Sequence, residues 1–263
     1  MGLRIFKPPS PVMQHAPTLE IQGPIATLCL QRPASANKIT PDDLAVLRHH
    51  VDTVNRTESV LLLVLRSTGK HFCAGYDITQ VSGSQTEGQG FGDMVDAIEN
   101  CRAVTLAVVQ GGVYGGATDM VLACDFRMGS HTIEMFMPAA RLGLHYYLSG
   151  LERYVSRLGV DMAKRLFLTA EKLDAQQMKD CGFLTHLVAP EALQAQSEAL
   201  CQQLATMAPL ALLGMKYHLN RIARGVADAQ AVRASVLQTL ASQDLKEGGL
   251  AWQEKRTPRF TGR

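Results

Sequence analysis

Two stretches of similar design decide the fold: VLLLVLRSTGKHFCAGYDI at residues 60–78 and VTLAVVQGGVYGGATDM at residues 104–120. Each begins with a continuous apolar run, which is typical of a strand buried on both faces of a parallel sheet. A glycine-containing turn follows each run, and the second turn leads into a helical pattern. Because DFRMG at residues 125–129 has the features of a third parallel strand, we predict an α/β sheet.

The segments on either side of the first stretch fit this sheet. Residues 18–32 have the pattern of two strands joined at Gln22-Gly23-Pro24. A helix is expected from Pro41, with Thr40 as its N-cap and acidic residues in its first turn. Another helix is expected near residues 91–102.

The chain changes character beyond about residue 150. Its apolar residues recur there at helical spacing, and no strand pattern of comparable length follows, so we expect the last third to be all-helical. The segments with this spacing are 160–168, 174–181, 190–206, 209–224 and 229–255. We also expect a flexible lead-in over residues 1–16, which contain several prolines, and a mobile Gly/Ser/Gln-rich loop over residues 82–92.

Composition and charge narrow the class of protein. Apolar residues make up 46% and charged residues 19%, a balance typical of a globular chain. The net charge of +2 argues against a surface built mainly for nucleic acid or anionic membranes. The six cysteines show no CxxC spacing, so we expect reduced thiols, no metal site and a cytoplasmic location.

Two familiar motifs match only superficially. Gly111 and Gly116 have the glycine spacing of a P-loop, but Ala117 stands where the phosphate-binding lysine belongs. Residues 67–70 match the SxxK pattern of β-lactamases, yet Ser67 ends a buried strand and neither SDN nor KTG occurs. We therefore exclude both functions.

The two glycine turns are the more informative feature. Glycines at the carboxyl ends of adjacent parallel strands let backbone N–H groups point into a common crevice, where such sheets bind ligands. Two convergent N–H donors, one of them at a helix N-terminus, form a site for an oxygen that develops negative charge. The alternative interpretation, that these glycines only permit tight turns and close packing, stays open on this evidence alone.

Four segments resemble the crotonase, or enoyl-CoA hydratase/isomerase, superfamily: HFCAGYDI (71–78), GGVYGGATDMVLACDFRM (111–128), FMPAARLGL (136–144) and EKRTPRFTGR (254–263). The resemblance implies a ClpP/crotonase spiral of ββα units over residues 17–200 and a helical trimerisation region over residues 201–263. It further implies an enzyme of fatty acid metabolism that acts on acyl-CoA thioesters. Coenzyme A would be part of the substrate, no cofactor would be tightly bound, and the subunits would form a trimer or a pair of trimers.

The resemblance also assigns roles to individual residues. Tyr76, after the Ala-Gly pair, and Gly116, the second glycine of its pair, take the positions of the two oxyanion-hole N–H donors. Coenzyme A contacts fall on Ala74 and Ile78, in the adenine pocket, and on Trp252 and Lys255, which would close over the cofactor portion from this chain or a neighbouring subunit. For the last two residues, a solvated basic tail with one packed aromatic is an equal alternative.

The sequence departs from the hydratase pattern at both acid/base positions. Hydratases of this superfamily hold water between two glutamates. Asp119 takes the first position, three residues beyond Gly116, and we expect its carboxylate to face the site. Ala139 takes the second, so efficient hydration is not expected, because losing a general acid or base typically costs 10²–10⁴ in rate.

The replacements are closer to the methylmalonyl-CoA decarboxylase branch, which lacks the paired glutamates. That branch places a tyrosine three residues beyond the glycine of its LG pair, and Tyr146 stands there, with His145 and Tyr147 beside it. It has histidine where Tyr76 stands and glutamate where Asp119 stands. The leading hypothesis is thus a lyase that decarboxylates a malonyl-type CoA ester through an enolate.

Two alternatives remain. One is an enoyl-CoA hydratase or double-bond isomerase that uses Asp119 as its only carboxylate. The other is a non-catalytic relative that binds acyl-CoA or RNA, against which the near-neutral charge and the two retained oxyanion turns both argue.

Overall fold

A mixed six-stranded sheet forms the centre of the protein, which is described here from a computed structural model covering residues 15–78 and 87–263. The strand order is β1-β2-β3-β4-β6-β9, and β1 is antiparallel to β2 while the other neighbours are parallel. The strands are β1 (Thr18–Gln22), β2 (Ile25–Leu30), β3 (Leu62–Ser67), β4 (Val104–Val109), β6 (Phe126–Ser130) and β9 (His186–Val188). The predicted α/β sheet is confirmed.

A second, three-stranded sheet crosses the carboxyl ends of the first. Its order is β5-β7-β8, with β5 parallel to β7 and β7 antiparallel to β8. The strands are β5 (Gly112–Tyr114), β7 (Glu134–Phe136) and β8 (Leu173–Asp174). Sequence reasoning treated residues 111–116 as a turn only, because three residues are too few to show an alternating pattern.

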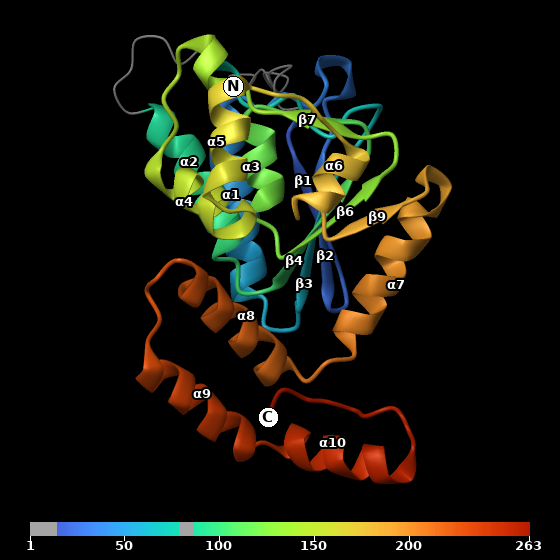
Figure 1. The fold of residues 1–263 in the computed structure, drawn as a ribbon. Coiled ribbons are helices and arrows are strands. Elements are labelled where there is room, and N and C mark those ends of the chain that lie inside the picture. Colours follow the sequence, from blue (N-terminus) through green and yellow to red (C-terminus); the bar gives the residue numbers. More distant parts are fainter. Residues whose placement is uncertain (1–14, 79–86) are drawn as a thin grey trace, which may run out of the picture.

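The central sheet is buried on both faces because its apolar strands alternate between two cores. Leu63 and Leu65 of β3 pack with the buried residues of α1, α2 and α3. Leu62 and Val64 point the other way and pack with residues of α7. Figure 1 shows the same arrangement, with α1–α4 on one side of the sheet and α7 on the other.

The helices begin and end close to where the sequence predicts. The Asp43 carboxylate accepts a hydrogen bond from the backbone N–H of Thr40, which fixes the start of the first helix. The helices are α1 (Pro41–Arg56), α2 (Glu87–Glu99), α3 (Gly116–Leu122), α4 (Leu148–Leu158), α5 (Val160–Thr169), α6 (Ala175–Asp180), α7 (Leu193–Ala205), α8 (Pro209–Ala223), α9 (Ala229–Leu240) and α10 (Gln243–Glu254). Sequence reasoning missed α4.

Three expectations need correction. The last third is not all-helical, because β8 and β9 are short edge strands that depend on β7 and β6 for pairing. The segment 229–255 divides into two helices at Ser242, whose hydroxyl caps α10 by accepting from the N–H of Leu245. Of the expected loop 82–92, residues 87–92 belong to α2 and the rest lie outside the described residues, as does nearly all of the lead-in 1–16.

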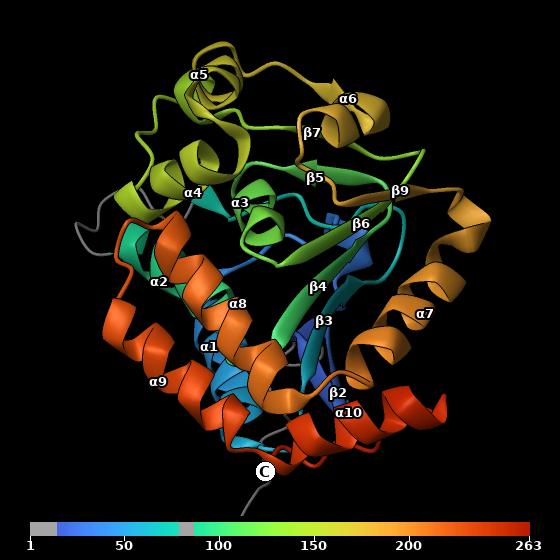
Figure 2. The same ribbon diagram turned by 60° about the horizontal axis from the view of Figure 1, so that its bottom comes forward.

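The last three helices extend from the core as an arm below the central sheet (Figure 1). Figure 2, which brings this end forward, shows α8 running alongside α9. Many large apolar side chains of the arm are exposed: Met215, Tyr217, Leu219, Ile222, Val236, Leu237, Leu240, Leu245, Leu250 and Trp252. Within the described ranges, no helix is both long and apolar enough to span a bilayer.

A buried lysine attaches this arm to the sheet. Lys216 of α8 places its Nζ atom 2.5 Å from the carbonyl oxygen of Ala103 and 2.7 Å from a carboxylate oxygen of Asp125. The same carboxylate accepts from the N–H of Thr105, so it depends on Lys216 for charge compensation in a largely dry site.

We expect Lys216→Met to lower the free energy of unfolding by about 3 kcal/mol, because it leaves the Asp125 carboxylate buried without its cation. Urea unfolding measures the loss. Lys172→Met is the matched control, since the ion pair of Lys172 with Glu134 is largely exposed and is worth at most about 1 kcal/mol. Equal effects of the two variants would contradict this prediction.

Candidate active site

The two glycine turns lie side by side at the carboxyl end of the sheet. The backbone N–H of Tyr114 donates to the carbonyl of Cys73 at 3.0 Å, and that of Phe72 donates to the carbonyl of Gly112 at 3.0 Å. These bonds pair the segment after β3 with β5. The chain therefore brings residues 74–76 against the turn at 115–116, as the sequence predicts.

Gly75 makes this approach possible. Its φ of +93° is one that L side chains rarely adopt, and a Cβ atom there would lie 2.6 Å from the carbonyl oxygen of Tyr114. The same Cβ would lie 3.2 Å from the amide nitrogen of Gly116. Both turns are thus in van der Waals contact through backbone atoms alone.

Strand pairing orients the backbone of Tyr76. The N–H of Ile39 donates to the carbonyl of Gly75 and the N–H of Asp77 donates to the carbonyl of Ile39, both at 2.9 Å. In a parallel bridge of this kind, the N–H of the residue between the two partners points away from the neighbouring strand. The N–H of Tyr76 therefore points away from Ile39.

A cavity of about 660 Å³ opens beside the two turns. Five residues predicted for the site line it: Ala74, Tyr76, Ile78, Gly116 and Tyr146. The remaining lining residues are Phe91, Tyr114, Gly115, Phe136, Met137, Pro138, Ala139, Leu142, Leu144, His145 and Tyr147. The wall is predominantly apolar, which is typical of a small-molecule site.

Trp252 and Lys255 do not reach this cavity within one chain. Both belong to the end of α10, which lies at the opposite end of the molecule from β7 (Figure 1). Trp252 is 87% exposed. A contact of these residues with a ligand in this cavity would therefore require a second copy of the chain.

Asp119 does not face the cavity as expected. Its side chain is fully buried, and its Oδ2 atom lies 2.6 Å from Nη1 of Arg153 on α4. The hydroxyl of Tyr147 donates to the same oxygen. Because sequence reasoning missed α4, it missed the cation that draws this carboxylate away from the ligand side and behind the tyrosines.

Two stacked tyrosines separate Asp119 from the cavity. The rings of Tyr146 and Tyr147 lie 4.4 Å apart between centroids, and their hydroxyl oxygens are 3.3 Å apart. Gly150 leaves room for them, since a Cβ there would lie 2.4 Å from the Tyr146 ring. Burial, and then the charge of Asp119, raise the pKa of both hydroxyls well above the ordinary value, so both stay protonated at neutral pH.

Sequence reasoning also missed the opposite wall. Tyr114 lines the cavity and donates to Oε1 of Glu134 at 2.7 Å, and Lys172 lies 3.0 Å from the same oxygen. Burial and this hydrogen bond raise the pKa of Tyr114 to about 12. Phe91 closes the floor, because a Cβ on Gly116 would lie 2.6 Å from its ring. Only the final tertiary packing reveals either contact.

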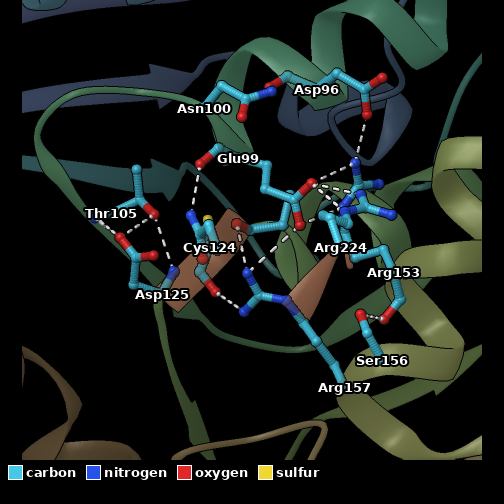
Figure 3. A network of polar contacts seen from close by, with 12 residues as sticks. Asp96, Glu99, Asn100, Thr105, Cys124, Asp125, Arg153, Ser156, Arg157 and Arg224 are labelled. Carbon is cyan, nitrogen blue, oxygen red and sulfur yellow. Dashed lines mark hydrogen bonds and ion pairs between the residues drawn. The ribbon is translucent and has the colours of Figure 1, made fainter. Parts of the chain in front are cut away.

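Arg153, the partner of Asp119, belongs to a larger network of charged side chains, part of which is shown in Figure 3. Arg153 also lies 2.5 Å from Asp96 and 3.1 Å from Glu99, both on α2. Glu99 further pairs with Arg157 of α4 and with Arg224, which follows α8. Burial raises the pKa of Glu99, but the arginines outweigh it and hold this pKa below its ordinary value of 4.5.

Among the residues that the structure describes, no group of histidine, cysteine and carboxylate side chains is arranged to hold a metal ion. The polar groups of the cavity wall include backbone N–H groups, tyrosine hydroxyls and the exposed His145, whose Nδ1 lies 2.8 Å from the carbonyl oxygen of Tyr146.

Comparison with known proteins identifies relatives along nearly the whole chain. A family model described as enoyl-CoA hydratase/isomerase matches residues 20–263. The chain is 32% identical over 213 residues to enoyl-CoA isomerase/hydratase fer4 of Mycosarcoma maydis, covering 77% of each protein. It is 29% identical over 250 residues to crotonyl-CoA hydratase of Syntrophomonas wolfei, covering 92% of this chain and 96% of the relative.

Solved structures agree on the fold. Pseudomonas aeruginosa DspI is similar with a TM-score of 0.87 and 28% identity, over 94% of this chain and 97% of that one. An enoyl-CoA hydratase/carnithine racemase from Magnetospirillum magneticum reaches a TM-score of 0.89 at 23% identity, over 94% and 96%, which is a likeness of fold alone. The expected crotonase-type architecture is confirmed.

The Glu99 carboxylate should make the free energy of unfolding depend on pH in the acidic range. A carboxyl whose folded pKa is depressed stabilises the native state above its unfolded pKa and loses that contribution as pH falls through the folded pKa. We expect Glu99→Gln to be about 3 kcal/mol less stable than the parent at pH 7, and this gap to shrink as pH falls from about 5 to 3.

Urea unfolding at several pH values measures that gap. Glu191→Gln is the control, because Glu191 is exposed and its substitution should leave the unfolding free energy nearly unchanged throughout. A gap between Glu99→Gln and the parent that stays constant down to pH 3 would contradict the prediction.

Proposed function

Because the chain belongs to the enoyl-CoA hydratase/isomerase family, we propose that its cavity binds an acyl-CoA thioester and stabilises an enolate. The backbone N–H groups of Tyr76 and Gly116 would hold the thioester oxygen as it becomes negatively charged. Each such donor is worth about 2.7–4 kcal/mol of transition-state stabilisation in comparable sites. This pair is therefore the largest catalytic contribution in the proposal.

The observation that carries this proposal is the contact of Gly75 with the second turn. A Cβ atom on Gly75 would lie 3.2 Å from the amide nitrogen of Gly116, so its absence lets the two turns approach closely. The hydrogen bond from the N–H of Tyr114 to the carbonyl of Cys73 then holds them together. Donors that are fixed before the reaction need no reorganisation as charge develops, which is the condition for a large rate effect.

The coenzyme A portion would pass the first turn and continue outward. Ala74 and Ile78 lie on the cavity wall next to Tyr76, in keeping with a pocket for the adenine ring. We propose that Trp252 and Lys255 contact the same ligand from a neighbouring subunit. The exposed apolar side chains of α8–α10 favour such an assembly, either a homotrimer or a pair of trimers.

The cavity favours decarboxylation of a malonyl-type CoA ester over hydration. None of the described residues that line it is a carboxylate, and Asp119 is committed to Arg153. In decarboxylation, the bond from the α-carbon to the carboxylate breaks, carbon dioxide leaves, and the electron pair passes into the enolate held by the two N–H groups. The α-carbon then takes up a proton. Tyr146 would orient the carboxylate before it leaves.

One observation supports a second candidate, hydration or double-bond isomerisation. Tyr147 lines the cavity and its hydroxyl bonds to Asp119, so this carboxylate could exchange a proton with a ligand through the tyrosine. Asp119 would then act as the only base of the reaction. The names of two relatives, an enoyl-CoA isomerase/hydratase and a crotonyl-CoA hydratase, agree with this second candidate.

Mass spectrometry of the products tests both candidates. The purified chain is incubated with methylmalonyl-CoA and crotonyl-CoA, and we expect loss of carbon dioxide from the first and no change in the second. Addition of water to crotonyl-CoA would favour the second candidate, and survival of both compounds would count against each. Gly75→Ala is the control for a contaminating enzyme, because its Cβ would collide with the carbonyl of Tyr114 and should reduce turnover at least about 100-fold.

The role of Tyr146 gives a separate prediction. Tyr146→Phe removes one hydroxyl from the cavity and keeps the stacked ring, so we expect decarboxylation to fall about 10- to 100-fold in kcat/KM with little change in stability. Steady-state kinetics and thermal unfolding measure the two effects. Unchanged kcat/KM would show that the ring only packs.

A further inference from the structure

We propose that Asp119, held as a carboxylate by Arg153, is a positioning residue that withholds the Tyr147 proton from the cavity. The carboxylate of the acyl group would then accept a hydrogen bond from the hydroxyl of Tyr146 but none from that of Tyr147. This inference rests on the proposed function for its kinetic consequence, but the direction of the Tyr147 proton can be tested without turnover.

Elementary donor and acceptor chemistry fixes that direction. An ionised carboxylate only accepts hydrogen bonds and a guanidinium only donates them. Arg153 and Tyr147 both approach Oδ2 of Asp119, so the tyrosine must donate its single proton there. Toward Tyr146 and the cavity, the Tyr147 oxygen is then an acceptor only.

Tyr146 keeps a proton available for a ligand. Its hydroxyl oxygen lies 3.3 Å from that of Tyr147, longer than the 2.7–2.8 Å typical of a good hydroxyl–hydroxyl bond. The side chain lines the cavity, and its ring is held by Tyr147 and Phe167. A ligand carboxylate can therefore accept a hydrogen bond from the Tyr146 hydroxyl, which replaces only the weak bond to Tyr147.

Charged and polar groups from several elements surround the carboxylate of Asp119. Arg153 of α4 is the ion pair that the described structure gives it, and Oδ1 has no hydrogen-bond partner among the described residues. Three tyrosine hydroxyls lie near the charge, those of Tyr146, Tyr147 and Tyr154. On α2, Asp96 and Glu99 fix Arg153 from its other side. The guanidinium of Arg153 is therefore the cation that compensates the buried charge of the acceptor.

Withholding a donor benefits a decarboxylation. The donor from Tyr146 orients the carboxylate for cleavage, whereas a second donor would chiefly stabilise the ground state and be lost as carbon dioxide forms. A second donor therefore tightens binding and slows the chemical step. An acceptor behind Tyr147 thus lowers the affinity for the substrate carboxylate and raises kcat. A merely structural Asp119 would not link these two quantities.

Two variants at the same position separate acceptor from charge. Asp119→Leu removes the acceptor and frees the Tyr147 proton, whereas Asp119→Asn removes the charge but keeps an amide oxygen that can accept. Arg153 retains Asp96 and Glu99 in both. For methylmalonyl-CoA we expect Asp119→Leu to lower KM and kcat together, each on the order of tenfold, and Asp119→Asn to change both less. Asp119→Leu/Tyr147→Phe should reverse the drop in KM.

A binding measurement provides the readout that does not need turnover. Isothermal titration compares succinyl-CoA, which carries a carboxylate, with butyryl-CoA, which has the same chain length without one. We expect Asp119→Leu to raise the preference for succinyl-CoA about tenfold. If no variant decarboxylates but this preference rises, the proposed function fails and the positioning role stands. If the parent decarboxylates and the preference does not rise, the positioning role is overturned.

A second pair of variants covers the case in which Asp119→Leu does not fold. In the otherwise unchanged chain, Tyr146→Phe should weaken succinyl-CoA binding on the order of tenfold more than Tyr147→Phe does, because only Tyr146 donates to the ligand. Equal losses from the two variants would overturn the inference.

Discussion

The close packing of two backbone turns is the constraint on which the site depends. Gly75 places its α-carbon where any side chain would strike the carbonyl of Tyr114, and the pairing of Tyr76 with Ile39 turns the N–H of Tyr76 away from Ile39. The parallel sheet supplies the frame, since the carboxyl ends of β3 and β4 are neighbours.

Buried charge connects that cavity to distant parts of the chain. Arg153 joins Asp119, behind the tyrosines, to Glu99 on α2. Arg224 joins Glu99 to the helical arm (Figure 3). Each ion in such a network is costly to bury and requires its partners to stay in place. The network therefore holds α2, α4 and the end of α8 in one geometry, and the tyrosine wall with them.

Local sequence patterns predicted the strands and turns that carry the site. They did not predict features that depend on contacts between residues far apart in the sequence. The apolar runs and glycines predicted β3, β4 and their turns, and Ala74, Tyr76 and Gly116, to which the resemblance assigns roles, line one cavity. Asp119 was assigned the wrong orientation, because its partner Arg153 lies 34 residues away on a helix that the sequence reasoning missed. The short strands β8 and β9 show no alternation of their own, so only pairing reveals them.

The division of the cavity into two kinds of wall has an evolutionary consequence. The side proposed to polarise the ligand is made of main-chain atoms, and Gly75 leaves no room there for a side chain. The facing side, residues 136–147, is made of side chains on a separate loop and a short helical turn. Under the proposed function, descent with modification could therefore exchange one reaction for another by substitutions on that loop, while the main-chain element opposite is inherited intact.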